Sequence, residues 1–327
     1  MNKLIRSLSR AFVVLSTTVT CLLPVHAQTF PSKPVRLVVP YLTGGLPDVM
    51  ARLVAQKVSE TTGQSVIVDN RSGASGIIAA EHVAKSAPDG YTVFVGDIGH
   101  YAINPAIYPT LAYNPGRDFA PITAAVHGPL LLVVNADVPV NTLQELIAYA
   151  KARPGKVNYG SPGNASVHQL AMAQLALSAN VEMTHIPYRS LAQAVPALLT
   201  NDVSVMFSSP PAVSAHVKSG KLRVLAVAAD KRTPLAPGVP TVAEEGFPGF
   251  TAVTTIGFLA PAATPPEVMA WLHREFTTAL RSKDVSEKMP ALGVSVVADA
   301  PSDFARQIRA DQQYFQDLVK RVGLKID

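Results

Sequence analysis

Cysteine is almost absent from this sequence of 327 residues, since it occurs once, as Cys21. That residue lies in a mostly apolar run over residues 11–23, which follows a basic start and is too short to span a bilayer comfortably. The pattern is typical of a secretory signal peptide, and small residues at positions 25 and 27 predict cleavage after Ala27. The residues before Cys21 make a poor lipoprotein motif, so we expect no lipid anchor. The exported chain then forms no disulfide, which favours the bacterial periplasm over a disulfide-stapled secreted domain.

Charged and aromatic residues are also sparse, at 16% and 6% of the chain. The signal peptide contains Lys3, Arg6 and Arg10 and no acid, so its removal leaves 25 basic residues against 23 acidic ones. With no basic patch and few aromatic residues, the composition argues against nucleic acid as a partner. The remainder has no long apolar run, so we expect it to be soluble. We also expect it to be a monomer. Its length, about 300 residues, is large for one hydrophobic core and favours two lobes.

Catalytic and cofactor motifs are missing as well. The sequence has no G-x-S-x-G nucleophile motif, no phosphate-binding loop of the G-x-x-x-x-G-K-[ST] type and no G-x-G-x-x-G dinucleotide motif. Seven histidines follow the signal peptide, and none has H-x-H or H-E-x-x-H spacing, so neither a metal nor a cofactor is expected. These absences favour a binding protein over an enzyme.

Near the start of the exported chain, the sequence does contain a strand, a glycine loop and a helix start. The apolar run Val35–Val39 is typical of a buried parallel strand, and Gly44 and Gly45 allow a close approach to the backbone that side chains prevent. The dipeptide Pro47-Asp48 suits the first turn of a helix. The N–H groups of a helix N-terminus attract carboxylates, so residues 40–48 are a candidate anion site. A tight turn that binds nothing fits the same residues.

Strand and helix patterns alternate along the rest of the chain. They indicate an α/β protein with mostly parallel sheets that is divided into two lobes, and the two crossover segments between the lobes form a hinge. After a signal peptide at residues 1–27, we expect residues 28–126 plus 252–327 to form lobe 1 and residues 127–251 to form lobe 2. Ligands in such sheets bind beyond the carboxyl ends of the strands.

A second glycine loop, residues 160–166, also stands between a strand and a helix start. If the two loops face each other, two helix N-termini converge on one cavity. Serine is more often a simple helix cap than a ligand contact, and Ser166 fits that role. Outside the main candidates, His168 could also contact a ligand, and Arg189 could pair with an anion or stay solvated. The candidate ligand-binding residues are Tyr41, Thr43, Gly44, Gly45, Asp48, Asp97, His100, Ser161, Gly163, Asn164, Ser166, Tyr188 and Ser208.

A series of short motifs resembles the Bug receptors, the substrate-binding proteins of tripartite tricarboxylate transporters. The motifs follow in order over essentially all of the exported chain: residues 30–40 (FPSKPVRLVVP), 69–71 (DNR), 87–92 (APDGYT), 102–105 (AINP), 118–121 (DFAP), 160–164 (GSPGN), 239–244 (VPTVAE) and 258–261 (FLAP). The resemblance implies a two-lobe periplasmic binding protein, a Venus flytrap without catalysis. Such a receptor binds a small organic acid and serves a membrane permease of the tripartite tricarboxylate type. The resemblance also implies that backbone N–H groups of the two glycine loops hold the ligand carboxylate, often through water.

Five positions or segments depart from the usual family pattern. Leu42-Thr43 replaces a proline pair, Pro47 replaces a threonine, Ile98 an asparagine, Ser208 an aspartate, and residues 189–191 a Lys-Gly-Gly segment. These changes make the site more apolar and remove an acid. We therefore expect a monocarboxylate or dicarboxylate with an apolar or aromatic body. Two other functions fit the same scaffold: a receptor that acts on a sensor kinase, and, with less support, a periplasmic enzyme.

Overall fold

The computed structural model describes residues 30–234 and 236–324, so the predicted signal peptide and its cleavage site lie outside the described residues. The chain divides after Ser32, and the fold described below is that of the compact unit that begins at Lys33. Among the described residues, no helix combines the length and the apolar character that crossing a membrane requires.

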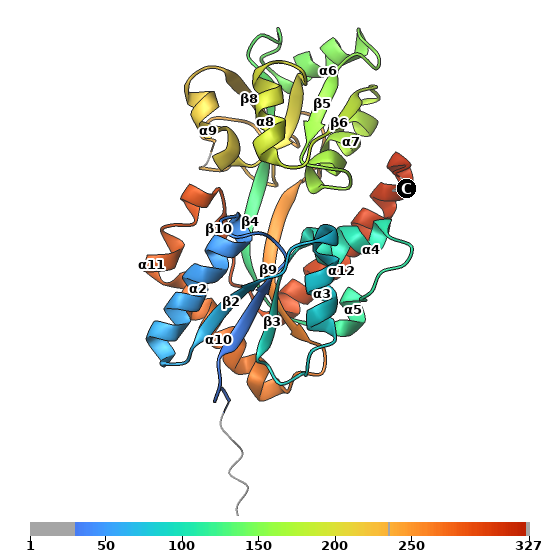
Figure 1. Cartoon of the computed structure of the whole chain (residues 1–327). Helices are drawn as coiled ribbons and strands as arrows, with labels where there is room; N and C mark the ends of the chain where they lie inside the picture. Colours follow the sequence, from blue (N-terminus) through green and yellow to red (C-terminus); the bar gives the residue numbers. More distant parts are fainter. Residues whose placement is uncertain (1–29, 235, 325–327) are drawn as a thin grey trace, which may run out of the picture. The chain divides into compact units, whose positions relative to one another are not determined.

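In the described part of the chain, ten strands join into one sheet with the order β2-β1-β3-β9-β4-β7-β5-β6, and β8 and β10 also pair with β4 (Figure 1). The strands are β1 (Val35–Val39), β2 (Val66–Asn70), β3 (Thr92–Asp97), β4 (Phe119–Asn135), β5 (Asn158–Ser161), β6 (Thr184–Pro187), β7 (Val205–Ser208), β8 (Leu222–Ala228), β9 (Val253–Pro261) and β10 (Ser295–Val296).

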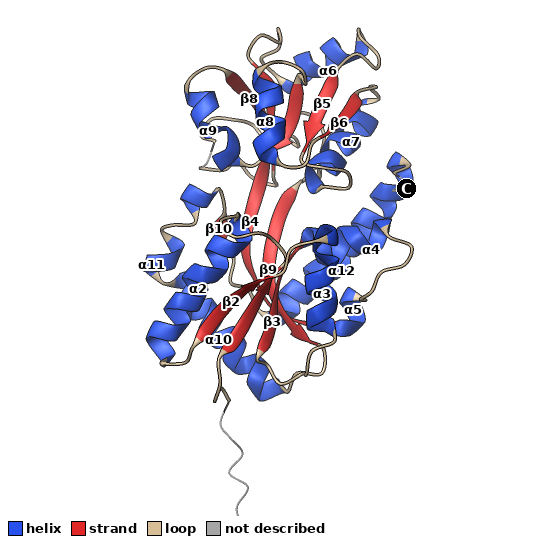
Figure 2. Ribbon diagram, in the orientation of Figure 1, coloured by secondary structure: helices blue, strands red, loops and turns tan. Residues whose placement is uncertain are grey.

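Helices connect these strands and cover the sheet (Figure 2). The α-helices are α2 (Leu46–Thr62), α3 (Ile77–Ala84), α4 (Asn104–Ile107), α5 (Pro115–Asp118), α6 (Leu143–Lys151), α7 (Val167–Ala179), α8 (Leu191–Leu199), α9 (Pro210–Lys218), α10 (Pro266–Arg281), α11 (Lys283–Ser286) and α12 (Pro301–Val322). Three further helical segments are the 3₁₀ turns η1 (Ala74–Gly76) and η3 (Pro290–Leu292) and the π-helical η2 (Gly99–Ile103).

Strand directions make the sheet mixed rather than mostly parallel. The pairs β1–β2, β1–β3, β5–β6 and β5–β7 are parallel, as expected for β-α-β units. Every pair that includes β4 or β9 is antiparallel. The expectation of parallel pairing therefore holds within two groups of short strands, β1 with β2 and β3, and β5 with β6 and β7. It fails for β4 and β9, which connect these two groups.

The strands β4 and β9 lie side by side through the middle of the sheet (Figure 1). Their register runs from Phe119↔Pro261 to Pro129↔Val253, with β3 paired to the other edge of β9. The strands β7 and β8 pair with the later part of β4. Both predicted crossing points thus fall on or beside one antiparallel pair, and the division into two lobes stays a prediction.

Apolar side chains on α12 pack against the sheet and against a helix from another part of the chain. Phe304, Ile308, Phe315 and Leu318 recur with helical spacing and are all buried in one cluster. The same cluster contains Leu170 of α7. Helices α7 and α12 are therefore held together by apolar contact across about 140 residues of sequence.

The close approach of Phe304 to Gly257 in the middle of β9 leads to a testable prediction. A Cβ at position 257 would lie 2.5 Å from Cε1 of Phe304 and 2.9 Å from the carbonyl oxygen of Thr123, closer than carbon atoms normally pack. We expect Gly257→Ala to lower the free energy of unfolding by about 1–3 kcal/mol, as in other overpacked cores. Chemical denaturation measures this change.

Gly116 supplies the matched control for that measurement. It lies in α5, and a Cβ there would meet its nearest neighbour, Oδ1 of Asn114, at an ordinary distance of 3.6 Å. Gly116→Ala should leave the stability within about 0.5 kcal/mol of the wild type, since a surface substitution without strain has little effect. Equal stabilities of the two variants would contradict the packing argument.

Candidate functional site

A cavity of about 780 Å³ lies where loops leave the carboxyl ends of five strands. Its walls come from the segments after β1, β2, β3, β5 and β6, together with Thr254 of β9. This is the place where open α/β sheets bind ligands. The cavity therefore unites the two glycine loops that the sequence analysis singled out.

Four helices begin at the wall of this cavity. Their N-cap residues are Gly45 for α2, Gly76 for α3, Ser166 for α7 and Ser190 for α8, and all four line the cavity. Ser166 accepts a hydrogen bond from the backbone N–H of Gln169, whereas the other three N-caps make no side-chain capping bond. N–H groups at uncapped helix starts are available to an anion, and the helix dipole adds a partial positive charge.

Asp48 holds the first glycine loop in shape from behind. Its carboxylate accepts hydrogen bonds from the backbone N–H of Gly44 at 2.9 Å, from Nδ2 of Asn70 at 2.9 Å and from Nε of Arg52 at 3.1 Å. Burial alone would raise the pKa of Asp48, but these hydrogen bonds outweigh it and hold the pKa below the usual value. Asn70 also donates to the carbonyl oxygen of Tyr41 at 3.0 Å, so the loop is fixed at both ends.

The loop after β2 contributes a wall that the sequence analysis did not include among the candidate residues. Ser72, Gly73, Ser75 and Gly76 line the cavity. Gly76 has a φ of +78°, and a Cβ on it would collide with the imidazole of His100. Glycine at this position therefore allows both the positive φ and the close packing of the segment after β3. The spacing of Gly73 and Gly76 before a helix is the signal that could have pointed to this loop.

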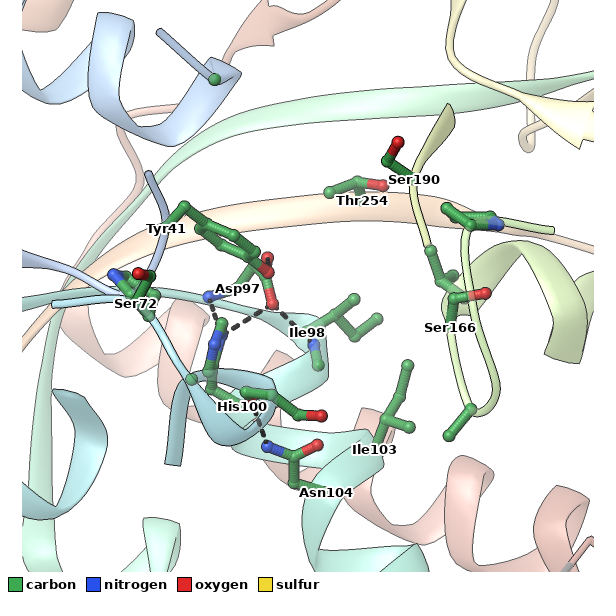
Figure 3. A pocket seen from close by; sticks show the side chains of 18 of the residues that line it. Tyr41, Ser72, Asp97, Ile98, His100, Ile103, Asn104, Ser166, Ser190 and Thr254 are labelled. Atoms are coloured by element: carbon green, nitrogen blue, oxygen red, sulfur yellow. Dashed lines mark hydrogen bonds and ion pairs between the residues drawn. The ribbon is translucent and has the colours of Figure 1, made fainter. Parts of the chain in front are cut away.

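Asp97 and His100, both buried, form a polar group with the partly exposed Tyr41 where β3 ends (Figure 3). The hydroxyl of Tyr41 donates to Oδ2 of Asp97 at 2.5 Å, and Nδ1 of His100 lies 2.8 Å from Oδ1. The backbone N–H of Gly99 donates to the same Oδ1 at 2.9 Å. Asp97 is only 8% exposed, so its charge is satisfied inside the protein rather than offered to a ligand.

The pKa of Asp97 reflects these contacts. Burial favours the neutral acid and would raise the pKa, but the attraction of His100, together with hydrogen bonds from His100, Tyr41 and Gly99, holds it below the usual value. The ionised carboxylate thus ties the first glycine loop, through Tyr41, to the turn η2. Its role is to position the wall of the cavity.

On the opposite wall, the second glycine loop is organised by buried groups beneath it. Oγ of Ser161 donates to the carbonyl oxygen of Gly163 at 2.9 Å and lies 2.7 Å from Nε2 of His185. Gln169 bonds Nδ1 of His185 at 3.1 Å and accepts from the backbone N–H of Ala165 at 2.6 Å. Ser161 is fully buried and supports the loop from below.

The predicted residues divide into those that line the cavity and those that lie beside or behind it. Tyr41, Thr43, Gly45, Asp97, His100, Asn164 and Ser166 line it. Gly44, Asp48, Ser161, Gly163, Tyr188 and Ser208 are not part of the lining. The side chains of Asp48 and Ser161 bond to the loop backbone, and Tyr188 packs in an apolar cluster beside Leu191. Ser208 is buried, and its hydroxyl has no hydrogen-bond partner among the described residues.

The lining is poor in charge and rich in apolar surface. Of the described residues that line the cavity, Arg189 has the one permanent positive charge and Asp97 the one carboxylate. Leu42, which is 74% exposed, joins other apolar lining residues, among them Ile98 and Leu191. In the described ranges, no three His, Cys, Asp or Glu side chains gather where they could hold a metal ion. The lining thus offers mostly hydrocarbon surface together with one permanent positive charge.

The Asp97 contacts predict a pH dependence of stability. Because the folded pKa of Asp97 lies below that of an unfolded aspartate, about 3.9, its ionised form contributes fully above that pH. The contribution is lost as the pH falls through the folded pKa. We expect the free energy of unfolding of the wild type to exceed that of Asp97→Asn by about 1–3 kcal/mol at pH 7. This difference should shrink below about pH 4.

Melting temperatures of both proteins from pH 3 to pH 7 check this expectation. Asp137→Asn, which changes an exposed aspartate outside the cavity, is the control and should show no comparable narrowing. A difference between wild type and Asp97→Asn that stays constant down to pH 3 would argue against an ionised, partnered Asp97.

Comparison with known proteins identifies the family. Residues 50–324 match the model of the tripartite tricarboxylate transporter family receptor. A solved structure of R. palustris Rpa4515 with adipate is similar at a TM-score of 0.80 and 35% identity, over 90% of this chain and 99% of that one.

Two further solved structures are similar over almost the same span. The periplasmic binding protein BugD has a TM-score of 0.77 and 30% identity, over 90% of this chain and 99% of its own. MatC from Rhodopseudomonas palustris with bound malate has a TM-score of 0.76 and 32% identity, over 89% of this chain and 100% of its own. The fold and the family match agree, and this chain belongs to the tripartite tricarboxylate transporter receptors, a family of periplasmic solute-binding proteins rather than enzymes.

Proposed function

We propose that this protein is a receptor that binds a small organic carboxylate in the cavity and delivers it to a membrane permease of the tripartite tricarboxylate type. The observation that carries the proposal is the convergence of four helix N-caps, Gly45, Gly76, Ser166 and Ser190, on one cavity. Three of these helix starts have no side-chain cap, so those of their N–H groups that no backbone carbonyl already occupies can bind the oxygens of a carboxylate.

The charges around the cavity are compatible with an anionic ligand. The carboxylate of Asp97 is paired with His100 and Tyr41, which reduces its repulsion of a second anion. Arg189 adds a positive charge at the opposite wall. The adipate and malate bound to similar proteins of the family support a carboxylate as the ligand here.

The apolar lining further restricts the class of acids that the cavity suits. Leu42, Ile98, Ile103, Val167 and Leu191 contribute hydrocarbon surface that a carbon chain or ring can cover. Burial of apolar ligand surface is favourable by roughly 25 cal/mol per Å². We therefore propose an acid with an apolar body, such as a linear dicarboxylate, rather than a highly polar tricarboxylate.

Transport requires export of the receptor and a signal to the permease. We propose that residues 1–27 are removed on export and that the rest folds as a periplasmic monomer. Lobe 1, residues 28–126 plus 252–327, then closes on lobe 2, residues 127–251, around the ligand. Differential affinity for the closed form drives such a closure. The family match supports the permease as the partner that recognises the closed form.

Ligand binding to the refolded protein tests the proposal. The exported chain is unfolded and refolded to remove captured ligand, and its melting temperature is measured with adipate, malate, benzoate and citrate. We expect adipate to raise the melting temperature more than citrate does. At about 100 times the dissociation constant, a ligand stabilises the folded state by roughly 2.7 kcal/mol.

Calorimetric titration of each acid that raises the melting temperature gives the dissociation constants. Amino acids, amides and sulfonates are run beside the carboxylates as a control panel. Tight binding of citrate with no binding of adipate would contradict the apolar-body proposal. Binding confined to the control panel would contradict a carboxylate ligand altogether.

A further inference from the structure

His168 is the one histidine of the cavity wall whose ring has no hydrogen-bond partner among the described residues. It follows the N-cap Ser166 by two positions, in the first turn of α7, and it lines the cavity. Both Nδ1 and Nε2 are buried, and neither has a partner. Buried polar atoms without partners are rare in folded proteins, so this ring requires an explanation.

The neighbouring histidines differ from His168 in this respect. His100 on the facing wall lies against the carboxylate of Asp97 at 2.8 Å. His185 beneath the second glycine loop contacts both Ser161 and Gln169. The site therefore satisfies its supporting histidines within the protein and leaves His168 unpaired in the wall.

The ring of His168 is uncharged near neutral pH. Burial lowers the pKa of His168 to about 4. The positive end of the α7 dipole also disfavours an imidazolium at this position. A neutral imidazole has one N–H donor and one acceptor nitrogen. It can therefore donate a hydrogen bond to an oxygen of an acid without forming an ion pair with it.

The ring can turn its nitrogens toward the cavity without moving the backbone. Because both nitrogens are inaccessible while the residue lines the cavity, its carbon atoms are the ones that face the space. A half-turn about the Cβ–Cγ bond exchanges Nδ1 with Cδ2 and Nε2 with Cε1. The χ2 torsion of histidine is broad and roughly two-fold, so this rotation is accessible.

We propose that His168 determines specificity by donating a hydrogen bond from its neutral ring to the second oxygen-bearing end of a bound acid, so that the cavity prefers dicarboxylates to monocarboxylates of the same length. This inference rests on the proposed function, because it assigns a residue to the same cavity. The uncapped helix starts of the facing wall hold the first carboxylate, and His168 donates to the carboxylate at the other end of the ligand.

Adipate and hexanoate provide a matched pair of probes, since both have six carbons and only adipate has a second carboxylate. Dissociation constants are measured for wild type, His168→Leu, His168→Gln and the control His216→Leu, whose residue lies on α9 and does not line the cavity. We expect His168→Leu to bind adipate about tenfold more weakly, as for loss of a hydrogen bond to a charged group. Hexanoate affinity should change less than about twofold, and His168→Gln should keep most of the preference because its amide also donates.

Two further measurements separate recognition from folding. The melting temperature of ligand-free His168→Leu should equal or exceed that of wild type, because the substitution removes unpaired buried nitrogens. Nitrogen-15 spectra of the histidine rings should show a neutral His168 at pH 6 and a protected ring N–H after adipate is added. Wild-type adipate affinity in His168→Leu, or a ring signal unchanged by adipate, would overturn the inference.

The outcomes also separate this inference from the proposed function. If no acid binds wild type but a compound of the control panel does, the carboxylate proposal fails, and the same variants are tested with that compound. An unchanged affinity of His168→Leu for it then overturns the role of His168. A wild type that binds no compound of either panel contradicts both.

Discussion

The antiparallel pairing of β4 with β9 is the constraint on which the sheet and the cavity both depend. The register from Phe119↔Pro261 to Pro129↔Val253 places β9 between β4 and β3, and the part of β4 beyond this register pairs with both β7 and β8. The strands that lead into the cavity loops are thus attached to β4 and β9, directly or through one or two neighbours. A bend at β4 and β9 would move both walls of the cavity relative to each other, whereas each wall keeps its own strands. A Cβ added at Gly257 would collide with Phe304, which shows how little space the core leaves around β9.

The proposed binding by helix starts follows from this arrangement and accounts for the low charge of the site. Parallel β-α units place the start of each helix at the same edge of the sheet as the carboxyl end of its strand. Four such starts therefore meet at one cavity, and their N–H groups can replace basic side chains. The side chains of Asp48, Asp97 and Ser161 are then free to fix the loops, and each is hydrogen-bonded to its own loop or turn. Aspartate side chains are compatible with the proposed carboxylate ligand as long as they are paired or directed away from it.

The sequence allowed the prediction of features that depend on neighbours along the chain. The strand Val35–Val39, the glycine loop after it and the cap at Ser166 are local patterns, and the structure has each of them. The loop containing Ser72 and Gly76 was missed as a wall, because its place in the cavity depends on the packing of Gly76 against His100, 24 residues later. The direction of a side chain was equally inaccessible: Asp48 follows a glycine loop, yet it bonds to Gly44 and Asn70 behind the cavity. Mixed strand direction was also not predictable, since nothing local marks β9 as antiparallel to both of its neighbours.

The wall that contains His168 depends on a contact far away in sequence. Val167 lines the cavity and also packs with the cluster that joins Leu170 to Phe315 and Leu318 of α12. The orientation of the α7 start is therefore set by the C-terminal helix as well as by its own loop. A ligand stabilises one arrangement of the walls only through contacts that differ between arrangements. The proposed contact at His168 would meet this condition if α7 moved relative to the facing loops, and such a movement would also disturb the apolar contact between α7 and α12.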